Sequence, residues 1–253
     1  MRGGANLNII SLSCANIEHE HICCSLSDKK GKYGVKSKKE WLQKRFSEGL
    51  VFKKFDVKGK AFIEYIPAEK AWCPVNADGY IFINCLWVSG QYKGKGLGGR
   101  LLDECINDAE DKNGIIVVSS KQKKPWLAER KFFLHKGFEV CDSAPPYYEL
   151  LCLKFDENAV ELKFKECAKS LEIPLKEGIV IYYSHQCPFC ENYINDIEET
   201  AKEVNIPITI KRYESAEEAQ DAPCASTTFS VFYKSKFVTH EILTRDKCKK
   251  LVL

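Results

Sequence analysis

The chain has 253 residues, of which 45% are hydrophobic, and a net charge of +3, so it has ample apolar material for a core and is longer than one typical domain. No apolar run reaches the roughly 18 residues that a membrane span needs, and the N-terminus lacks a signal-peptide pattern. No basic stripe with interleaved aromatic residues is present. We therefore expect a cytoplasmic protein with neither a membrane nor a nucleic acid as partner.

The thirteen cysteines are odd in number and irregularly spaced. Most stand inside apolar runs such as Asn84-Cys85-Leu86, which favours reduced core thiols over a disulfide framework. His19 and Cys23 would share one helix face, but a structural zinc site usually needs four ligands and no second pair is evident. We expect no metal.

The first half of the chain is predicted to alternate strands and helices. In order, we expect a strand at 7–12, helices at 17–26 and 37–49, strands at 50–57, 61–67 and 80–88, a helix from 97, a strand at 115–119, a helix at 125–136, and strands at 137–140 and 147–155. Ser37 with Glu40 forms a capping box, and Pro125 suits the first turn of a helix.

A glycine-rich loop, Gln91-Tyr92-Lys93-Gly94-Lys95-Gly96, lies between the strand at 80–88 and the helix that opens with Leu97 and Gly98. Gly94 and Gly96 allow a close approach to the backbone, and the N–H groups at a helix start favour an anion, so the loop suits a pyrophosphate. A short glycine motif alone is more often a simple turn. The order strand, loop, helix and strand is what supports the phosphate interpretation.

This Q-x-x-G-x-G loop resembles the acetyl-CoA loop of the GNAT N-acetyltransferase superfamily. The segment 131–138 is similar to the F-Y-x-x-x-G-F ending of the fourth GNAT helix, and the predicted element order is the GNAT order. The resemblance implies an α/β (α+β) fold with a GNAT mixed sheet over residues 1–155, and acetyl-CoA held between strands 80–88 and 115–119 where they splay apart. The implied cofactor-binding residues are Leu86, Trp87, Val88, Gln91, Tyr92, Lys93, Gly94, Lys95, Gly96, Leu97, Gly98, Trp126 and Phe133.

Two positions depart from the GNAT pattern. A tyrosine that protonates the departing thiolate in many members is matched here by Phe133, and an asparagine that often faces the cofactor is matched by about Trp126. Glu64 is the best candidate for the general base and Cys85 for the acid. The alternatives are a water-facing carboxylate at the strand edge for Glu64 and simple core packing for Cys85.

Charge is distributed unevenly along the chain. Residues 1–155 carry 25 Lys and Arg against 18 Asp and Glu, whereas residues 156–253 carry 13 against 17. This difference supports two domains and places the positive field on the half that is expected to bind a polyanionic cofactor. Lys93, Lys95 and Arg100 can meet phosphate charge or can simply be solvated cations at a helix start.

The second half is predicted to hold a linker with a helix at 156–178 and a small domain at 179–253. We expect a helix at 159–171, strands at 179–184 and 206–213, helices at 191–204 and 216–222, strands at 229–233 and 237–242, and a helix at 244–253. Cys187-Pro188-Phe189-Cys190 stands at a strand-to-helix turn. This arrangement resembles a thioredoxin-like or glutaredoxin-like fold, and with the preceding domain it resembles acetyltransferases with a YoaP-like C-terminal domain.

The Cys187 and Cys190 pair admits three interpretations. The helix start favours a thiolate at Cys187, which suits redox activity. The point where redox members carry a cis-proline is Ser226-Thr227 here, which leaves a structural role open. Zinc would need two further ligands, for which His185 and Cys224 are the nearest candidates.

The leading functional hypothesis is an N-acetyltransferase that moves an acetyl group directly from acetyl-CoA to a primary amine of a small molecule or peptide. A thiol–disulfide oxidoreductase that uses Cys187 and Cys190 is the first alternative. A non-catalytic acyl-CoA sensor is the second, because Phe133 cannot act as an acid.

Overall fold

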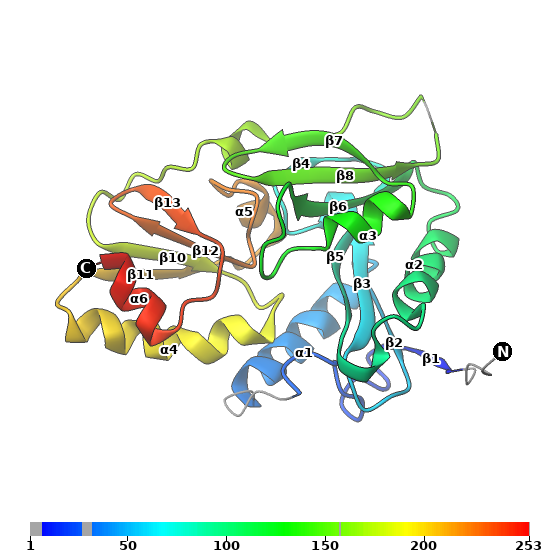
Figure 1. The fold of residues 1–253 in the computed structure, drawn as a ribbon, viewed down its shortest axis with the longest axis horizontal. Helices are drawn as coiled ribbons and strands as arrows, with labels where there is room; N and C mark the ends of the chain where they lie inside the picture. The colour runs from blue at the N-terminus through cyan, green and yellow to red at the C-terminus, as the bar shows by residue number, and fades with distance from the viewer. Residues whose placement is uncertain (1–6, 27–31, 157, 253) are drawn as a thin grey trace.

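The computed structural model describes residues 7–26, 32–156 and 158–252, so parts of the expected domains (residues 1–6, 27–31, 157 and 253) lie outside the described residues. A seven-stranded and a four-stranded sheet lie side by side (Figure 1). The mixed α/β class expected from the sequence is confirmed.

The large sheet is mixed. Its strand order is β1 (Ile9–Ser11), β2 (Val51–Phe55), β3 (Ala61–Pro67), β5 (Tyr80–Val88), β6 (Gly114–Ser120), β8 (Tyr148–Lys154) and β7 (Glu139–Ala144). Only β5 and β6 run parallel. The period of two along β5 sends Ile81 and Ile83 into the core under α2 (Leu97–Asn107) and α3 (Arg130–His135). Tyr80 and Phe82 face the opposite core, which includes Trp41 of α1 (Lys32–Phe46).

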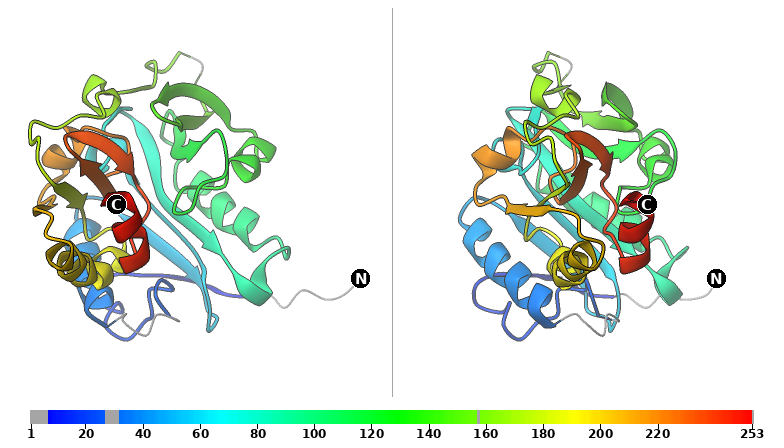
Figure 2. Two further views of the ribbon diagram at one scale, coloured as in Figure 1. Left: turned by 60° about the vertical axis from the view of Figure 1, so that its left-hand side comes forward. Right: turned by 90° about the vertical axis from the view of Figure 1, so that its left-hand side faces the viewer.

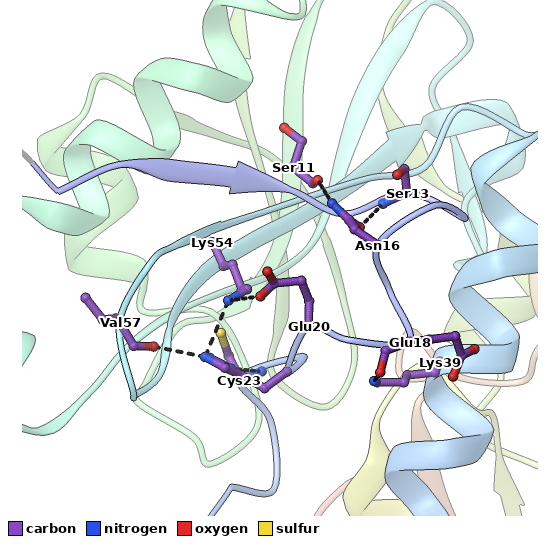
Figure 3. Close-up of polar contacts among 10 residues, drawn as sticks. Ser11, Ser13, Asn16, Glu18, Glu20, Cys23, Lys39, Lys54 and Val57 are labelled. Atoms are coloured by element: carbon purple, nitrogen blue, oxygen red, sulfur yellow. Dashed lines mark hydrogen bonds and ion pairs between the residues drawn. The ribbon is translucent and has the colours of Figure 1, made fainter.

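The expected helix at 17–26 is wrong, because this segment is a series of turns (Figure 3). Cys23 and Ser25 have φ angles of 61° and 56°, which an α-helix excludes. Polar contacts hold the turns instead: Asn16 Nδ2 donates to Ser11 O at 2.9 Å, and Glu20 Oε2 lies 2.8 Å from Lys54 Nζ.

Three other helices differ from expectation. Helix α1 begins at Lys32, so Ser37 lies inside it and the proposed capping box is wrong. Helix α3 begins at Arg130 rather than at 125, because Trp126 has a φ of 67°. In place of a helix at 159–171, the linker forms β9 (Lys163–Phe164), which pairs with β4 (Val75–Asn76), and a 3₁₀ turn, Glu166–Lys169.

The small sheet has the order β11 (Ile208–Arg212), β10 (Ile179–Tyr183), β12 (Phe229–Tyr233) and β13 (Lys236–Thr239). Strands β10 and β11 are parallel and the other pairs are antiparallel. Helices α4 (Pro188–Glu203) and α6 (Arg245–Val252) contribute to the core on one face of this sheet, through Ile194, Ile197 and Cys248.

The two sheets share one core. The apolar cluster that contains Trp41 and Trp72 also contains Tyr213 and residues in and just after the short helix α5 (Ala216–Gln220). Gln220 Nε2 donates to Glu69 O at 3.1 Å and to Ala71 O at 2.9 Å. Helices α1 and α4 lie side by side (Figures 1 and 2), which brings the start of α4 to the large sheet. Within the described residues, no helix has the length and apolarity to cross a bilayer.

Candidate active site

The glycine loop forms an open corner in front of α2. Gly94 and Gly96 have φ angles of 72° and 75°, and a Cβ added at either would meet no atom within 4 Å. The first backbone bond of the helix runs from Arg100 N–H to Gly96 O at 3.1 Å, so the N–H groups of Leu97, Gly98 and Gly99 have no partner inside the helix. Unpaired N–H groups at the positive end of a helix dipole, beside open space, fit a phosphate group.

The side chains near this corner divide into two groups. Gln91, Lys93 and Lys95 are exposed. The Tyr92 ring lies against Gly59, where an added Cβ would be 2.3 Å from Tyr92 Cε2. The Arg100 guanidinium donates to Leu7 O at 3.0 Å and lies 4.8 Å from the centroid of Phe55, so it is engaged with the N-terminal edge of the sheet.

Strands β5 and β6 separate after a short parallel contact, as expected. Their register ends at Ile83 and Val117. On the other side of β5, Glu64 pairs with Cys85 and Tyr65 pairs with Ile83, so Asn84 is the extra residue of a β-bulge. A bulge bends a strand and increases its twist. The bulge therefore accounts for the widening gap between β5 and β6, which we call the wedge. Along it, Leu86, Trp87 and Val88 have partly exposed side chains and no β6 partner.

Glu64 is buried in a polar cluster at this bulge. Its side chain has 3% relative exposure, so the water-facing alternative is wrong. Lys38 Nζ lies 2.7 Å from Glu64 Oε2 and donates to Oε1 at 2.8 Å, and Asn84 Nδ2 donates to Oε1 at 2.9 Å. Lys38 was not predicted from the sequence, and its Nζ also lies 4.2 Å from the centroid of the Trp41 ring.

Thiols of the first domain lie near this cluster, with Cys85 on β5 and Cys24 in the turns before α1. Burial raises the pKa of the Cys85 thiol well above its usual range, and the nearby Glu64 charge raises it further. Burial likewise raises the pKa of Cys24, whose thiol also interacts with the charges of Cys85 and Cys187. Cys85 and Cys24 are therefore neutral thiols at neutral pH.

Cys187 has the opposite character. The neighbouring Cys190 thiol lowers the pKa of Cys187, and the Phe189 N–H and the Lys38 charge lower it further, against burial, which raises it. Burial and the Cys187 charge raise the pKa of Cys190, which is 1% exposed and donates to Thr228 O at 3.2 Å. Cys187 is the N-cap of α4. The pair also lies close to α1, because a Cβ added at Gly34, four residues before Lys38, would be 1.9 Å from Pro188 O.

Phe189 joins this pair to both sides of the wedge. Its ring centroid lies 5.2 Å from that of Trp126, which follows β6 and is 48% exposed. Lys60 Nζ lies 5.7 Å from the Phe189 centroid and 4.5 Å from the centroid of Trp87 on β5. The Cys187–Cys190 turn therefore packs against the mouth of the wedge.

Phe133 lies in the core rather than on an open surface. It is 1% exposed and packs against Phe132 and Phe138 at centroid distances of 5.1 and 5.0 Å. Phe132, which the sequence analysis did not single out, lies nearer the glycine corner, since a Cβ at Gly98 would be 3.5 Å from its ring. Neither ring can exchange a proton.

The comparisons with known proteins identify the families that the chain matches. Residues 17–138 match the acetyltransferase (GNAT) family and residues 207–250 match the YoaP-like family. The chain is 46% identical over 245 residues to the uncharacterized N-acetyltransferase YoaP of Bacillus subtilis (strain 168), covering 96% of this chain and 97% of that protein.

Solved structures show more distant similarity. A GNAT family acetyltransferase from Brucella melitensis in complex with acetyl-CoA is 13% identical, with a TM-score of 0.41 over 62% of this chain and 94% of that chain. A GNAT family N-acetyltransferase from Escherichia coli in complex with CoA is 12% identical, with a TM-score of 0.43 over 66% of this chain and 94% of that chain.

Proposed function

The chain belongs to the family of GNAT N-acetyltransferases with a YoaP-like C-terminal region, and we propose that it acetylates a primary amine of a small molecule or peptide. It is an acyltransferase, and its acetyl donor is acetyl-CoA, which supplies the acetyl group as a reactive thioester when bound.

The open corner in front of α2 is the single observation that carries this proposal. Its free N–H groups at Leu97, Gly98 and Gly99 would hold the diphosphate, while Lys93 and Lys95 are near enough in sequence to add positive charge. The unpaired edge of β5 after the bulge offers further main-chain groups at Leu86, Trp87 and Val88 for an extended ligand.

The acceptor amine would meet the large sheet on the side of α1, where Glu64 lies. We assign Glu64 as the group that takes a proton from the amine. Lys38 and Asn84 hold its carboxylate in one position, so that it is oriented before an acceptor binds. The acceptor is expected to reach Glu64 past the turn that contains Phe189.

Cys85 is the candidate for the role of the missing tyrosine. Its register partner is Glu64, and its thiol keeps its proton at neutral pH because burial raises its pKa. The same raised pKa makes it a weak acid, so we propose that it stabilises the departing thiolate by a hydrogen bond and that the proton comes from the acceptor side, whereas Phe133 can do neither.

The purified full chain, mixed with acetyl-CoA and a panel of primary amines, should release free CoA with at least one amine. Glu64→Gln should lower kcat by about 100-fold or more, the usual size of a general-base effect, while acetyl-CoA binding persists in calorimetry. Glu139→Gln, on the exposed edge strand β7, is the matched control. Absence of acetyl-CoA binding would overturn the proposal, and tight binding without CoA release by any amine would favour the acyl-CoA sensor.

Thiol–disulfide oxidoreductase activity is the second candidate, and the lowered pKa of Cys187 at the N-cap of α4 favours it. We propose that residues 179–253 are a thioredoxin-like domain, because the order β11-β10-β12-β13, with one parallel pair and a Cys-x-x-Cys helix start, suits that fold. The turn packs against the large sheet through Phe189, which disfavours a large protein as redox partner. Insulin reduction that is lost in Cys187→Ser would support this candidate.

A further inference from the structure

The loop at 121–129, between β6 and α3, brings an exposed aromatic ring to the mouth of the wedge. Trp126 is 48% exposed, and its ring lies against Phe189 at a centroid distance of 5.2 Å. Its φ of 67° lies in the left-handed region, which is rare for a bulky residue. Residues that the surrounding structure holds in such a conformation cluster at active sites and ligand clamps. An exposed and strained tryptophan at this place therefore points to contact with a ligand.

A buried histidine of the second unit holds this loop in place. His240 is 2% exposed, its Nε2–H donates to Pro125 O at 2.8 Å, and its Nδ1 accepts from Tyr147 OH at 2.6 Å. Pro125 stands directly between Lys124 and Trp126, so the bond to its carbonyl fixes the backbone that carries both side chains. A loop that is ordered before a ligand arrives loses less entropy when the ligand binds.

Lys124 adds a positive charge beside this ring. Its Nζ lies 4.7 Å from the centroid of the Tyr147 ring, and no carboxylate within the described part of the chain forms an ion pair with it. The one acid of the loop, Glu129, pairs instead with Lys123 at 3.1 Å. Lys124 is partly buried, so water screens its charge less than that of a fully exposed lysine. This ammonium group can therefore bind an anionic group of a ligand.

The chemistry of the loop distinguishes among amines. A lysine without a carboxylate partner attracts a carboxylate and repels further positive charge. The rings of Trp126 and Phe189 offer an apolar surface beside it. A polyamine would meet like charge there and would leave the rings without an apolar partner. An amino acid or a short peptide offers a primary amine, an apolar side chain and a carboxylate together.

We propose that the loop recognises the acetyl acceptor, and that the preferred acceptors are amino acids or short peptides with an apolar side chain and a free carboxylate. Lys124 binds the carboxylate, and Trp126 with Phe189 packs against the apolar side chain. The inference rests on the proposed function, because it assigns a class to the amine that the acetyltransferase uses. These residues contribute to binding of the acceptor and leave the proton transfer to Glu64.

The test compares matched acceptors on the purified full chain, with release of free CoA as the readout. The panel is phenylalanyl-glycine, its C-terminal amide, glycyl-glycine, free phenylalanine and spermidine. The amide keeps the size and the amine of the dipeptide but removes the carboxylate charge. We expect kcat/KM to be about tenfold or more higher for phenylalanyl-glycine than for its amide, the effect of one charged hydrogen bond. Glycyl-glycine and spermidine should be slower than phenylalanyl-glycine, and the rate with free phenylalanine separates an amino acid from a peptide as the better acceptor.

Two variants assign the preference to the loop. Lys124→Met keeps an unbranched side chain and should raise KM for phenylalanyl-glycine about tenfold, with little change in kcat or in the rate with the amide. Lys123→Met is the matched control, because the Lys123 side chain is 83% exposed and already pairs with Glu129, and it should behave as the parent does. Trp126→Gly removes the ring and suits the positive φ, and it should lose most of the preference for phenylalanyl over glycyl acceptors.

Equal kcat/KM for phenylalanyl-glycine and its amide in the parent would overturn the inference while CoA release still supports the transferase. So would a full preference in Lys124→Met, or a Lys124→Met protein that has lost acetyl-CoA binding in calorimetry, since Lys124 would then serve the cofactor. No CoA release with any amine would instead overturn the proposed function and this inference with it.

Discussion

Lys38 and Glu64 form the most buried ion pair of the candidate site, with side chains 1% and 3% exposed. Removing one member of such a pair leaves an uncompensated buried charge, which typically costs about 3–5 kcal/mol. We predict that Lys38→Met lowers the free energy of unfolding by that amount in urea denaturation. The double variant with Glu64→Leu should recover most of the loss, and failure to recover it would show that the ion pair is not the cause.

His240 connects the two sheets through a fixed tautomer. Its Nε2–H donates to Pro125 O at 2.8 Å, so its Nδ1 accepts from Tyr147 OH at 2.6 Å and must be unprotonated. Burial lowers the pKa of His240, and Lys124 lowers it further against the opposing effects of Pro125 O and Glu241. The folded protein therefore prefers the neutral ring.

The sign of the pH effect follows from this preference. A histidine whose folded pKa is lowered contributes stability above its unfolded pKa of about 6.5, and that stability is lost as the pH falls toward the folded value. The urea midpoint should therefore drop between pH 7 and pH 5, and less steeply in His240→Phe. The exposed His135 on α3 supplies the control His135→Gln, which should leave the drop unchanged. An equal drop in His240→Phe would contradict the assignment.

At the residue scale, local motifs were predictable and distant partners were not. The positive φ angles at Gly94 and Gly96 follow from a motif of six residues. The Lys38–Glu64 contact joins residues 26 positions apart on a helix and a strand, and no periodicity in the sequence encodes it. The packing of Phe189 against Trp126 depends on how two sheets meet, which the sequence does not indicate.

At the scale of elements, α1 and α4 meet where Gly34 has no side chain. A Cβ added to Gly34 would lie 1.9 Å from Pro188 O, and the Gly34 N–H donates to Asn192 Oδ1 at 3.1 Å. Alanine normally stabilises a helix relative to glycine by about 1 kcal/mol. We predict instead that Gly34→Ala lowers the free energy of unfolding by about 1–3 kcal/mol, because the clash forces the helices apart.

The control is the same substitution in another helix. A Cβ at Gly99 of α2 would meet only the flexible end of Lys136, at 2.9 Å. Gly99→Ala should therefore be neutral or slightly stabilising in the same denaturation experiment. A stabilised Gly34→Ala would show that α1 and α4 are not in close contact.

The elements that were predicted correctly have strong local signals. The strands at 61–67 and 80–88 are found with the expected bounds, and α2 opens at Leu97 as its apolar stripe indicates. The helix at 17–26 failed because buried residues and tertiary polar contacts stabilise turns there. The strand pair β4 and β9 was missed because each strand has only two residues, too few to form a pattern.

At the scale of the whole molecule, one apolar cluster spans both sheets, so the C-terminal unit is part of the site's structure. It delivers Phe189 and Cys187 to the proposed acceptor side, while the glycine corner lies at the start of α2. In the proposed enzyme, the second unit thus completes the acceptor side of the GNAT sheet. From the sequence, only the succession of two domains along the chain could be predicted, and not the contact between them.

The central claim is that main-chain groups in front of α2 hold the diphosphate of the cofactor. Calorimetric titration with CoA tests it most directly in three proteins: the parent, Gly96→Val and Gly90→Val. Both glycines have a positive φ and open space for a Cβ, so valine should cost a similar backbone strain of about 1–2 kcal/mol at either position. Only Gly96, however, is the N-cap of α2. We predict that the parent binds CoA, that Gly96→Val weakens binding by at least about tenfold, the effect of losing one good contact, and that Gly90→Val binds nearly as the parent does. A parent that does not bind CoA, or a Gly96→Val protein that binds it equally well, would contradict the claim.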